Sequence, residues 1–397
     1  MNRQDFHMFI PAQVETALNT LEEAGFEAYL VGGCVRDALL GLQPEDFDIT
    51  TNALPAQTRA LFEPRYKLIT TGVKHGTIAP IIDRRPIEIT TYRIDGGYSD
   101  NRHPDSVHFS GRIEDDLARR DFTVNALAFS PARGLVDAFD SLRDLESGTI
   151  RCVGEADVRF GEDALRIMRA LRFSAVLGFE IEPQTAASIR KNIQSIRSVS
   201  AERIYTELKK LLSGKEAARV LAQFPCLWET LFGFSPSERA VRALEGEREA
   251  IFRLALLFAG EDAAALQRLK PDNKTYRYVK RLGELYQKEL AQEQTTASGL
   301  AMFMHQNNID VACMKALLRM HALLEEDFRA QAFPVEEAAQ MPLSVRELAI
   351  GGEDLLARGI TGKALSRELE RLLEAVIRGE VKNEKEALLK RESQHQC

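Results

Sequence analysis

The sequence predicts a mixed α/β head followed by all-α regions that fill the rest of the chain. Up to about residue 150, short segments rich in Val, Ile, Thr and Tyr alternate with short helical patterns, which is typical of an α/β unit. From Glu162 onward the pattern is almost continuously helical and rich in Leu, Ala, Glu, Lys and Arg. The chain has 397 residues, and domains usually hold about 100–200 residues, so we expect several regions.

The head and the helical part can be divided further. We expect six strands in the head, at residues 28–31, 47–50, 67–70, 77–82, 87–92 and 126–129. Proline-containing breaks such as Phe224-Pro225 and Phe333-Pro334 interrupt the helical part. We therefore predict four regions: a head at 1–150, a neck at 151–215, a body at 216–297 and a tail at 298–397.

The composition excludes several classes of protein. No run of about 18 apolar residues exists, so we expect no membrane span, and the N-terminus lacks an apolar signal region. The five cysteines are scattered without a close pair, which favours a reducing cytoplasm over a zinc site or a disulfide framework. The net charge of −7 is not that of a protein that coats nucleic acid, so any RNA contact must be local.

Two glycines followed by two aspartates form the most informative segment. Residues 30–33 read as a strand ending in a tight turn at Gly32-Gly33, a short helix follows, and Asp46 and Asp48 accompany a second strand. Side chains at i and i+2 of a strand point to the same face, so these two carboxylates aim at one point. Two hard oxygen ligands beside a turn whose amides can face phosphate indicate a magnesium–nucleotide site with Asp46 and Asp48 as metal ligands. The alternative is a solvated strand end.

A third carboxylate and a guanidinium complete this site. Nucleotidyl transfer needs divalent cations, held by carboxylates, to activate the attacking hydroxyl and neutralise the leaving pyrophosphate. Glu88 is the lone acid of an otherwise apolar or β-branched strand, so we predict that it joins the catalytic carboxylates; an edge-strand acid facing water is the alternative. Arg36 lies three residues after Gly33, where its guanidinium could hold a triphosphate by paired hydrogen bonds. An ordinary turn is the alternative for the glycines.

Four charged residues spaced by three form a second candidate site. Asp163, Arg166, Arg169 and Arg172 would lie near one another on a helix surface. Cytosine and adenine both present an amino donor beside a ring-nitrogen acceptor, whereas uracil and guanine present a carbonyl in place of the amino group. A carboxylate beside a guanidinium should therefore accept C and A and reject U and G. The alternative is a helix with ordinary ion pairs.

These motifs carry a resemblance to a known family. Gly32-Gly33-x-Val35-Arg36-Asp37 with Asp46-x-Asp48 resembles the polymerase-β-like nucleotidyltransferases. Residues 116–128, 161–173 and 348–383 match further segments of the family in the same order, so the resemblance covers nearly the whole chain. The chain is similar above all to the class II tRNA CCA-adding enzyme and poly(A) polymerase family, of the bacterial, Bacillus-like type.

The resemblance implies a fold, an activity and partners. The fold is a polymerase-β-like nucleotidyltransferase head with all-α neck, body and tail, of which the tail binds tRNA. The activity is addition of the 3′-terminal CCA to tRNA from CTP and ATP, without a nucleic-acid template, with Mg²⁺ as cofactor and release of pyrophosphate. In the family, Asp163 and Arg166 correspond to residues that read the incoming base, and Glu162 would orient Arg166.

Further residues are assigned on the same resemblance. Arg120 is carried over as a nucleotide contact, although Arg119 could exchange roles with it. Arg169 and Arg172 would steer the base-reading pair or the phosphates. The Gly-rich segment 93–105 is expected to be a mobile loop. Enzymes of the family that add only CC look truncated there, so its presence favours complete CCA addition; a plain surface connection is the alternative.

Three alternative functions remain at this point. A poly(A) polymerase is the nearest, and a partial enzyme that adds only CC or only A is the second. A rival of another class is a catalytically silent tRNA-binding protein, which the intact pair of Asp46 and Asp48 disfavours. The oligomeric state is left open.

Overall fold

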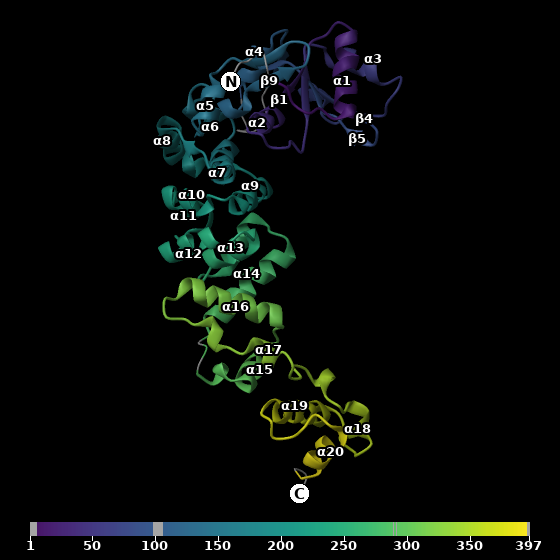
Figure 1. The fold of residues 1–397 in the computed structure, drawn as a ribbon, viewed down its shortest axis with the longest axis vertical. Coiled ribbons are helices and arrows are strands. Elements are labelled where there is room, and N and C mark those ends of the chain that lie inside the picture. The colour runs from purple at the N-terminus through teal and green to yellow at the C-terminus, as the bar shows by residue number, and fades with distance from the viewer. Residues whose placement is uncertain (1–5, 98–105, 289, 291, 395–397) are drawn as a thin grey trace. The chain divides into compact units, whose positions relative to one another are not determined.

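The computed structural model describes residues 6–97, 106–288, 290 and 292–394 of the chain (Figure 1). Two compact units divide it. The first holds Met1–Ser235, Arg248–Ala250 and Arg268–Pro271, and the second holds Pro236–Glu247, Ile251–Gln267 and Asp272–Cys397. The predicted class, an α/β head followed by helices, is confirmed; the finer division into four regions stays a prediction.

An eight-stranded mixed sheet forms the head in the first unit, in the order β10-β9-β1-β2-β6-β4-β3, with β5 paired to β4. Its neighbours are antiparallel except for β2 and β6, which are parallel. The strands are β1 (Ala28–Val31), β2 (Asp48–Thr51), β3 (Leu68–Ile69), β4 (Thr77–Ile82), β5 (Arg85–Pro86), β6 (Ile89–Thr91), β9 (Leu127–Ser130) and β10 (Gly134–Asp137). Two smaller ladders pair β7 (Arg93–Asp95) with β8 (Val107–Phe109), and β11 (Thr149–Ile150) with β12 (Glu180–Ile181).

All six predicted strands are present, with their ends shifted by at most two residues. β5, β7, β8, β10, β11 and β12 were not predicted, because strands of two to four residues carry too little alternation to be read. Glu88 was expected inside a strand, but it lies immediately before β6. Residues 98–105 of the expected loop lie outside the described residues.

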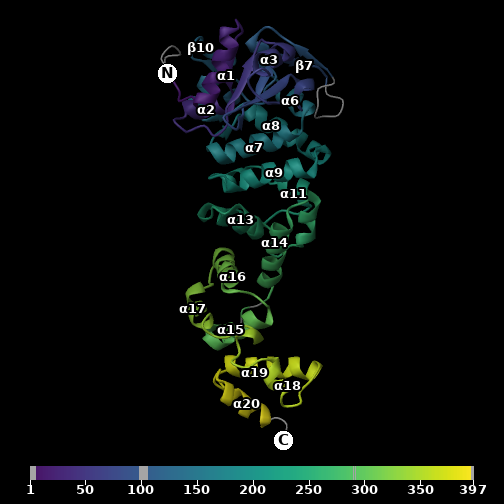
Figure 2. The same ribbon diagram turned by 90° about the vertical axis from the view of Figure 1, so that its right-hand side faces the viewer.

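Helices make up the rest of the first unit. They are α1 (Ala12–Glu23), α2 (Gly33–Leu39), α3 (Pro55–Phe62), α4 (Ile113–Ala118), α5 (Ser141–Glu146), α6 (Ala156–Glu162), α7 (Leu165–Leu177), α8 (Pro183–Asn192), α9 (Ala201–Ser213), α10 (Ala217–Gln223) and α11 (Cys226–Phe232). The α7 helix buries Ile167, Leu171 and Ser174 along one face, at helical spacing, and packs against α9 (Figure 2). This packing positions the residues of α7 that face the head.

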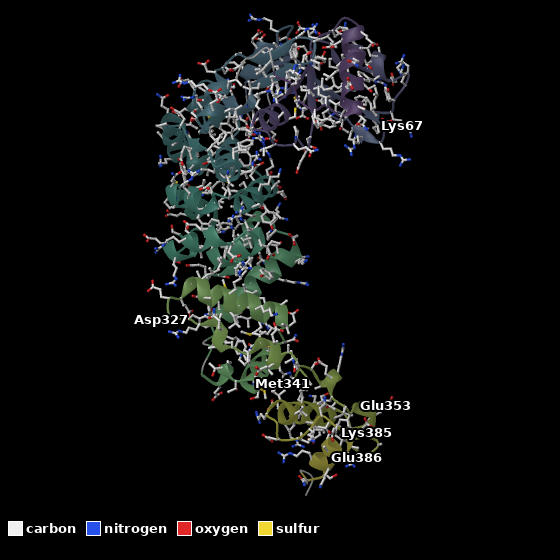
Figure 3. All side chains as sticks on the ribbon, viewed as in Figure 1. Lys67, Asp327, Met341, Glu353, Lys385 and Glu386 are labelled. Atoms are coloured by element: carbon white, nitrogen blue, oxygen red, sulfur yellow. The ribbon has the colours of Figure 1, made fainter. Side chains whose placement is uncertain are left out.

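The second unit is helical throughout its described residues. Its helices are α12 (Glu238–Ala243), α13 (Ala250–Leu257), α14 (Asn273–Tyr286), α15 (Ala297–Gln306), α16 (Val311–Leu324), α17 (Val335–Ala338), α18 (Gly352–Leu356), α19 (Lys363–Ile377) and α20 (Lys385–Ser393). Leu300, Leu317 and Leu372 are fully buried in its core. Near the C-terminal end, Lys385 of α20, labelled in Figure 3, forms an ion pair of 2.5 Å with Asp354 of α18. No helix among the described residues is both long and apolar enough to cross a membrane.

Candidate active site

The glycine turn lies where β1 ends and α2 begins. Gly32 has a φ of +74°, a conformation that L residues with a side chain rarely adopt. A Cβ atom on Gly32 would lie 2.8 Å from Nη1 of Arg120, so the guanidinium lies directly over the turn. The backbone N–H of Gly32 donates to the carbonyl of Leu127 on β9 at 3.1 Å, which fixes the turn against the sheet. The turn and Arg120 therefore form one wall of the site.

Sheet register brings the acidic residues to the same place. Asp48 is the first residue of β2 and pairs with Val31, the last residue of β1. The backbone N–H of Ile49 donates to the carbonyl of Glu88 at 2.9 Å, which places Glu88 beside Asp48. Asp46 precedes β2, so the expectation of two aspartates inside one strand is correct for Asp48 only. The carboxylates nevertheless gather at one end of two neighbouring strands.

Electrostatics show that these acids interact. Asp48 is exposed at the start of β2, but desolvation by the surrounding protein raises the pKa of its carboxyl, the negative charges of Glu88 and Asp46 raise it further, and Arg120 lowers it. Burial also raises the pKa of the Cys34 thiol to about 11, so Cys34 stays neutral at physiological pH. It packs beneath the site and is not a nucleophile.

The donor set suits a hard divalent cation. Three carboxylates supply oxygen ligands of the kind that Mg²⁺ prefers. A cation would offset both the desolvation and the repulsion that raise the pKa of Asp48. Within 6–97, 106–288, 290 and 292–394, no three His, Cys, Asp or Glu side chains converge closely enough to form a ready-made metal-binding group. Asp46, Asp48 and Glu88 thus fit the ion by the chemistry of their oxygens and by their electrostatic coupling, and not as a preformed cluster.

Two arginines face the glycine turn. Arg36 donates from Nη1 to Oδ1 of Asn125 at 2.7 Å and from Nε to Oδ1 of Asp37 at 2.8 Å, which fixes its guanidinium. Asp116, fully buried, pairs with Arg119 at 2.7 Å and with Arg120 at 3.3 Å. The guanidinium of Arg119 lies near Asp95, whereas the guanidinium of Arg120 lies over Gly32. Geometry thus separates the two neighbours that the sequence left interchangeable.

Asp163 and Arg166 do not share a helix. The α6 helix ends at Glu162 and α7 begins at Leu165, so Asp163 lies in the break with an extended backbone (φ −146°). The expectation of one continuous helix was wrong here. The carboxylate of Asp163 accepts a hydrogen bond from the backbone N–H of Leu165 at 3.0 Å, which caps the start of α7.

Arg166 is held in place on three sides. It donates to Glu162, as the sequence predicted, and also to the carbonyl of Arg159 at 3.3 Å and the carbonyl of Arg119 at 3.2 Å. Its side chain is only 11% exposed. These bonds orient one guanidinium from the neck toward the head.

Arg203 is a residue that sequence reasoning missed. From α9 it reaches back to Asp163, with Nη2 2.7 Å from Oδ2 and Nη1 3.4 Å from Oδ1. Both residues are part-buried. Asp163 is therefore held by Arg203 rather than by Arg166.

Arg169 and Arg172 pair with acids of other elements. Nε of Arg169 lies 2.6 Å from Asp121 of the head, and Nε of Arg172 lies 2.6 Å from Glu207 of α9. Both guanidinium groups, together with that of Arg36, surround the ring of Phe173 at 3.8–5.3 Å from its centroid. These contacts fasten α7 to the head and to α9, and the role of Arg169 and Arg172 in steering the base-reading pair or the phosphates stays a prediction.

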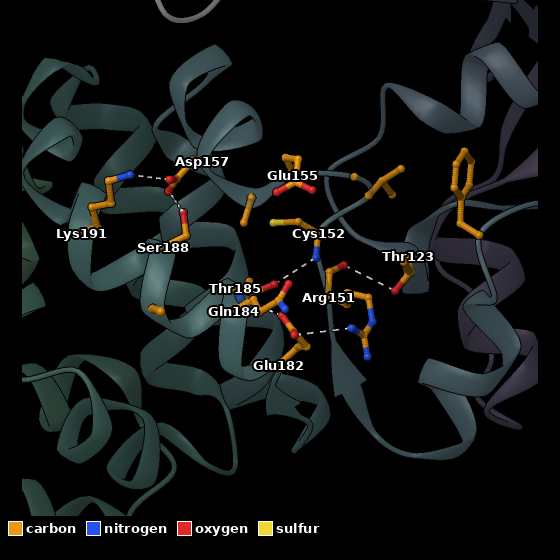
Figure 4. Close-up of a pocket in the computed structure, with 15 residues that line it drawn as sticks. Thr123, Arg151, Cys152, Glu155, Asp157, Glu182, Gln184, Thr185, Ser188 and Lys191 are labelled. Carbon is orange, nitrogen blue, oxygen red and sulfur yellow. Dashed lines mark hydrogen bonds and ion pairs between the residues drawn. The ribbon is translucent and has the colours of Figure 1, made fainter.

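A separate pocket of about 520 Å³ lies between residues 151–155, which follow β11, and the helices α6 and α8 (Figure 4). Most of its charged groups are paired with one another. Asp157 binds Lys191 and Ser188, and Arg151 lies 3.5 Å from Glu182. None of the predicted site residues lines it.

Comparison with known proteins identifies the family. The model of the Poly A polymerase head domain matches residues 28–151, and the model of tRNA nucleotidyltransferase domain 2 matches residues 243–391. A model of the RNA and SrmB-binding site of polymerase A matches residues 178–225. The CCA-adding enzyme of Limosilactobacillus fermentum is 36% identical over 401 residues, covering 96% of this chain and 97% of that protein. This chain belongs to the family of CCA-adding enzymes.

Solved structures of CCA-adding enzymes share the fold. The CCA-adding enzyme of Bacillus stearothermophilus in complex with CTP has a TM-score of 0.77 and 30% identity, and the match covers 97% of this chain and 98% of that one. The Thermotoga maritima CCA-adding enzyme complexed with tRNA has a TM-score of 0.65 at 21% identity, covering 96% and 95% of the two chains. The resemblance drawn from the motifs is confirmed.

Proposed function

We propose that this chain adds the 3′-terminal CCA to tRNA from CTP and ATP, without a nucleic-acid template. In each step the terminal RNA hydroxyl attacks the α-phosphorus of a nucleoside triphosphate. A new P–O bond forms, the α–β phosphoanhydride bond breaks, pyrophosphate leaves and the hydroxyl proton passes to solvent. The proposal is supported by the backbone register that places Asp48 beside Val31 and Glu88 near the Gly32 turn, and by the charges of Glu88 and Asp46, which act on Asp48.

Two pairs of residues are proposed to bind different parts of the nucleotide, one pair the triphosphate and the other the base. Arg36 and Arg120, beside the turn at Gly33, bind the triphosphate as fixed, bidentate-capable cations. Asp163 and Arg166 face the Watson–Crick edge and favour C and A, which present an amino group beside a ring nitrogen. The protein contributes mainly positioning and charge neutralisation.

Mg²⁺ is the proposed cofactor. Asp46, Asp48 and Glu88 would hold it, and the ion would supply charge neutralisation and a lowered pKa for the attacking hydroxyl. The proposed location is the cytoplasm, because Cys34, Cys152, Cys226 and Cys313 are free thiols. The helices that follow the head and neck are proposed to grip the tRNA by shape and backbone.

The test is a tRNA transcript that lacks CCA, incubated with each nucleoside triphosphate alone and in mixtures. We expect CTP alone to extend it by two nucleotides, and ATP to add one more to the product. UTP and GTP should give no extension. Long adenosine tails on unrelated RNA would instead indicate a poly(A) polymerase, and binding without extension would indicate a silent tRNA-binding protein.

A further inference from the structure

Phe173, in the second half of α7, is surrounded by three guanidinium groups. Their central carbons lie 3.8 Å (Arg172) and 5.3 Å (Arg36 and Arg169) from the centroid of its ring. Phe173 is only 5% exposed, and Phe122 of the head packs against it edge to face, with the centroids 5.9 Å apart. The face of an aromatic ring is negative and attracts cations, more strongly where water is excluded. The ring therefore lies at a buried, positively charged junction of α7 and the head.

The three cations repel one another. Burial lowers the pKa of Arg172, the charges of Arg169 and Arg36 lower it further, and nearby carboxylates raise it. Arg169 and Arg172 each have an acidic partner at 2.6 Å, and both belong to the same helix as Phe173. Arg36 comes from α2, so its contact with the ring joins the head to α7.

The hydrogen bonds of Arg36 leave part of its guanidinium for a ligand. Nε and Nη2 lie 2.8 and 2.7 Å from Oδ1 of Asp37, and Nη1 donates to Asn125 at 2.7 Å. Within the described part of the chain these contacts use three of the five N–H groups, so one N–H on each terminal nitrogen remains for phosphate oxygens. Nη2 also lies 3.7 Å from the position that a Cβ on Gly33 would take, so this end of the guanidinium adjoins the glycine turn.

Two contacts from outside α2 hold this guanidinium, and both lead to α7. Asn125 donates from Nδ2 to Asp121 at 3.2 Å, which turns its Oδ1 toward Arg36. Asp121 in turn accepts a hydrogen bond of 2.6 Å from Arg169 of α7. The second contact is the ring of Phe173, over which the central carbon of the guanidinium lies. The α7 helix thus holds Arg36 through a chain of hydrogen bonds and through an aromatic ring.

A cation that is already fixed binds its ligand more tightly, because less side-chain freedom is lost on binding. We propose that Phe173 is a positioning residue, whose ring holds Arg36 so that its two remaining N–H groups meet the triphosphate of the incoming nucleotide. The inference rests on the proposed function, in which Arg36 binds the triphosphate. Because α7 also carries Arg166, one helix then sets the place of a phosphate contact and of a base contact.

Binding titrations with CTP and with inorganic triphosphate, both in Mg²⁺, test this role. Phe173→Leu should raise the Kd for both ligands by the same factor, about 2- to 30-fold, the range of one cation–π contact. The ratio of kcat/KM for CTP over UTP should stay within twofold of the wild-type ratio, since Arg166 is held by Glu162 and by the carbonyl of Arg119 rather than by the ring.

A graded change of the ring separates its electrostatic role from its packing. Fluorine withdraws negative charge from the ring face with little change of shape, so trifluorophenylalanine in place of Phe173 should raise the Kd for inorganic triphosphate, and a singly fluorinated phenylalanine should have a smaller effect. Phe224 is the matched control, because it is 2% exposed and has the guanidinium of Arg190 4.7 Å from its ring centroid. The same replacements there should leave this Kd within twofold, and thermal melts check that each variant is folded.

A double-mutant cycle tests whether the ring acts through Arg36. In the Arg36→Gln background, Phe173→Leu should change the Kd for inorganic triphosphate by less than twofold.

Three results would contradict this role of the ring. They are a Kd for Phe173→Leu within twofold of wild type, an unchanged Kd with trifluorophenylalanine, and an equal effect of Phe173→Leu with and without Arg36. In each case CCA addition itself would stand. If the ring replacements weaken triphosphate binding as expected but the wild type extends no tRNA, the proposed function fails while the role of Phe173 remains.

Discussion

Arg203 on α9 and Asp163, which lies in the break between α6 and α7, form a two-point ion pair with N–O distances of 2.7 and 3.4 Å. A carboxylate has about four lone-pair positions, so Asp163 can accept from Arg203 and from a base amino group together. The pair also fixes the carboxylate plane. If Asp163 reads the incoming base as proposed, Arg203 acts on that base through Asp163.

Arg203→Ala should therefore weaken base selection. Without its partner, Asp163 keeps only the bond from the N–H of Leu165 and is free to rotate, so the ratio of kcat/KM for CTP over UTP should fall by about 10-fold or more, the value of one charge-assisted hydrogen bond. Arg203→Lys should restore part of the ratio. Arg219→Ala is the control, because Arg219 has an ion pair of 2.6 Å with Glu180 and a similar exposure of 25%. An unchanged ratio with a lower Tm would reduce Arg203 to a structural role.

Substitution of Gly32 should lower both stability and nucleotide binding, for two separate reasons. Its φ of +74° with a ψ of −126° lies outside the left-handed α region, so Gly32→Ala should cost more than the about 1–2 kcal/mol of a left-handed α residue. The added Cβ would also displace the Arg120 guanidinium, so we expect the Kd for CTP to rise by about 10- to 100-fold. Gly25→Ala is matched, because Gly25 has a φ of +85° and open space around it. Both variants should lose stability in thermal melts, Gly32→Ala by more than Gly25→Ala, and only Gly32→Ala should lose CTP binding.

Arg119 and Arg120 should differ although both pair with Asp116. Arg120→Ala removes the cation over the turn, so CTP affinity should fall by about 10- to 100-fold. Arg119→Ala should leave CTP affinity within about threefold and lower the Tm instead, because Arg119 also lies 3.8 Å from Asp95. Calorimetric titration with CTP and thermal melts measure both quantities. Equal losses of CTP affinity in the two variants would contradict the different roles of Arg119 and Arg120.

The strand, turn, helix and strand around Gly32 could be predicted because they depend on residues that are close in sequence. A strand, a glycine turn, a helix and a second strand carry their own periodicity and turn residues. The pairing of Glu88 with Asp48 was inferred from chemistry, and the parallel register of β2 and β6 supplies the physical reason for it.

The rest depends on contacts that sequence spacing does not encode. Arg203 reaches a residue 40 positions earlier, and no local pattern links the two. The sequence shows that the helix of Arg169 and Arg172 contains no acid to pair with them. It does not show that their partners, Asp121 and Glu207, come from other elements. The break at Asp163 did leave a signal, since aspartate is a favoured residue before the first turn of a helix.

The Asp48 carboxylate should lower the stability of the folded protein at neutral pH. Desolvation and the charges of Glu88 and Asp46 raise its pKa in the folded protein. As pH rises, the unfolded chain releases this proton first, so the folded state loses stability between the unfolded pKa of about 3.9 and the higher folded pKa. Asp48→Asn should therefore raise the Tm at pH 7, with a smaller difference toward pH 4.

The same variant should abolish catalysis, because a lost metal ligand removes several kcal/mol of transition-state stabilisation, or about a thousandfold or more in rate. Mg²⁺ should raise the Tm of the wild type, and chelation should reverse this, whereas Asp48→Asn should not respond. Melts at pH 4 and 7, with and without Mg²⁺, test both parts. A Tm at pH 7 below that of the wild type without Mg²⁺ would mean that Asp48 is satisfied by protein contacts alone.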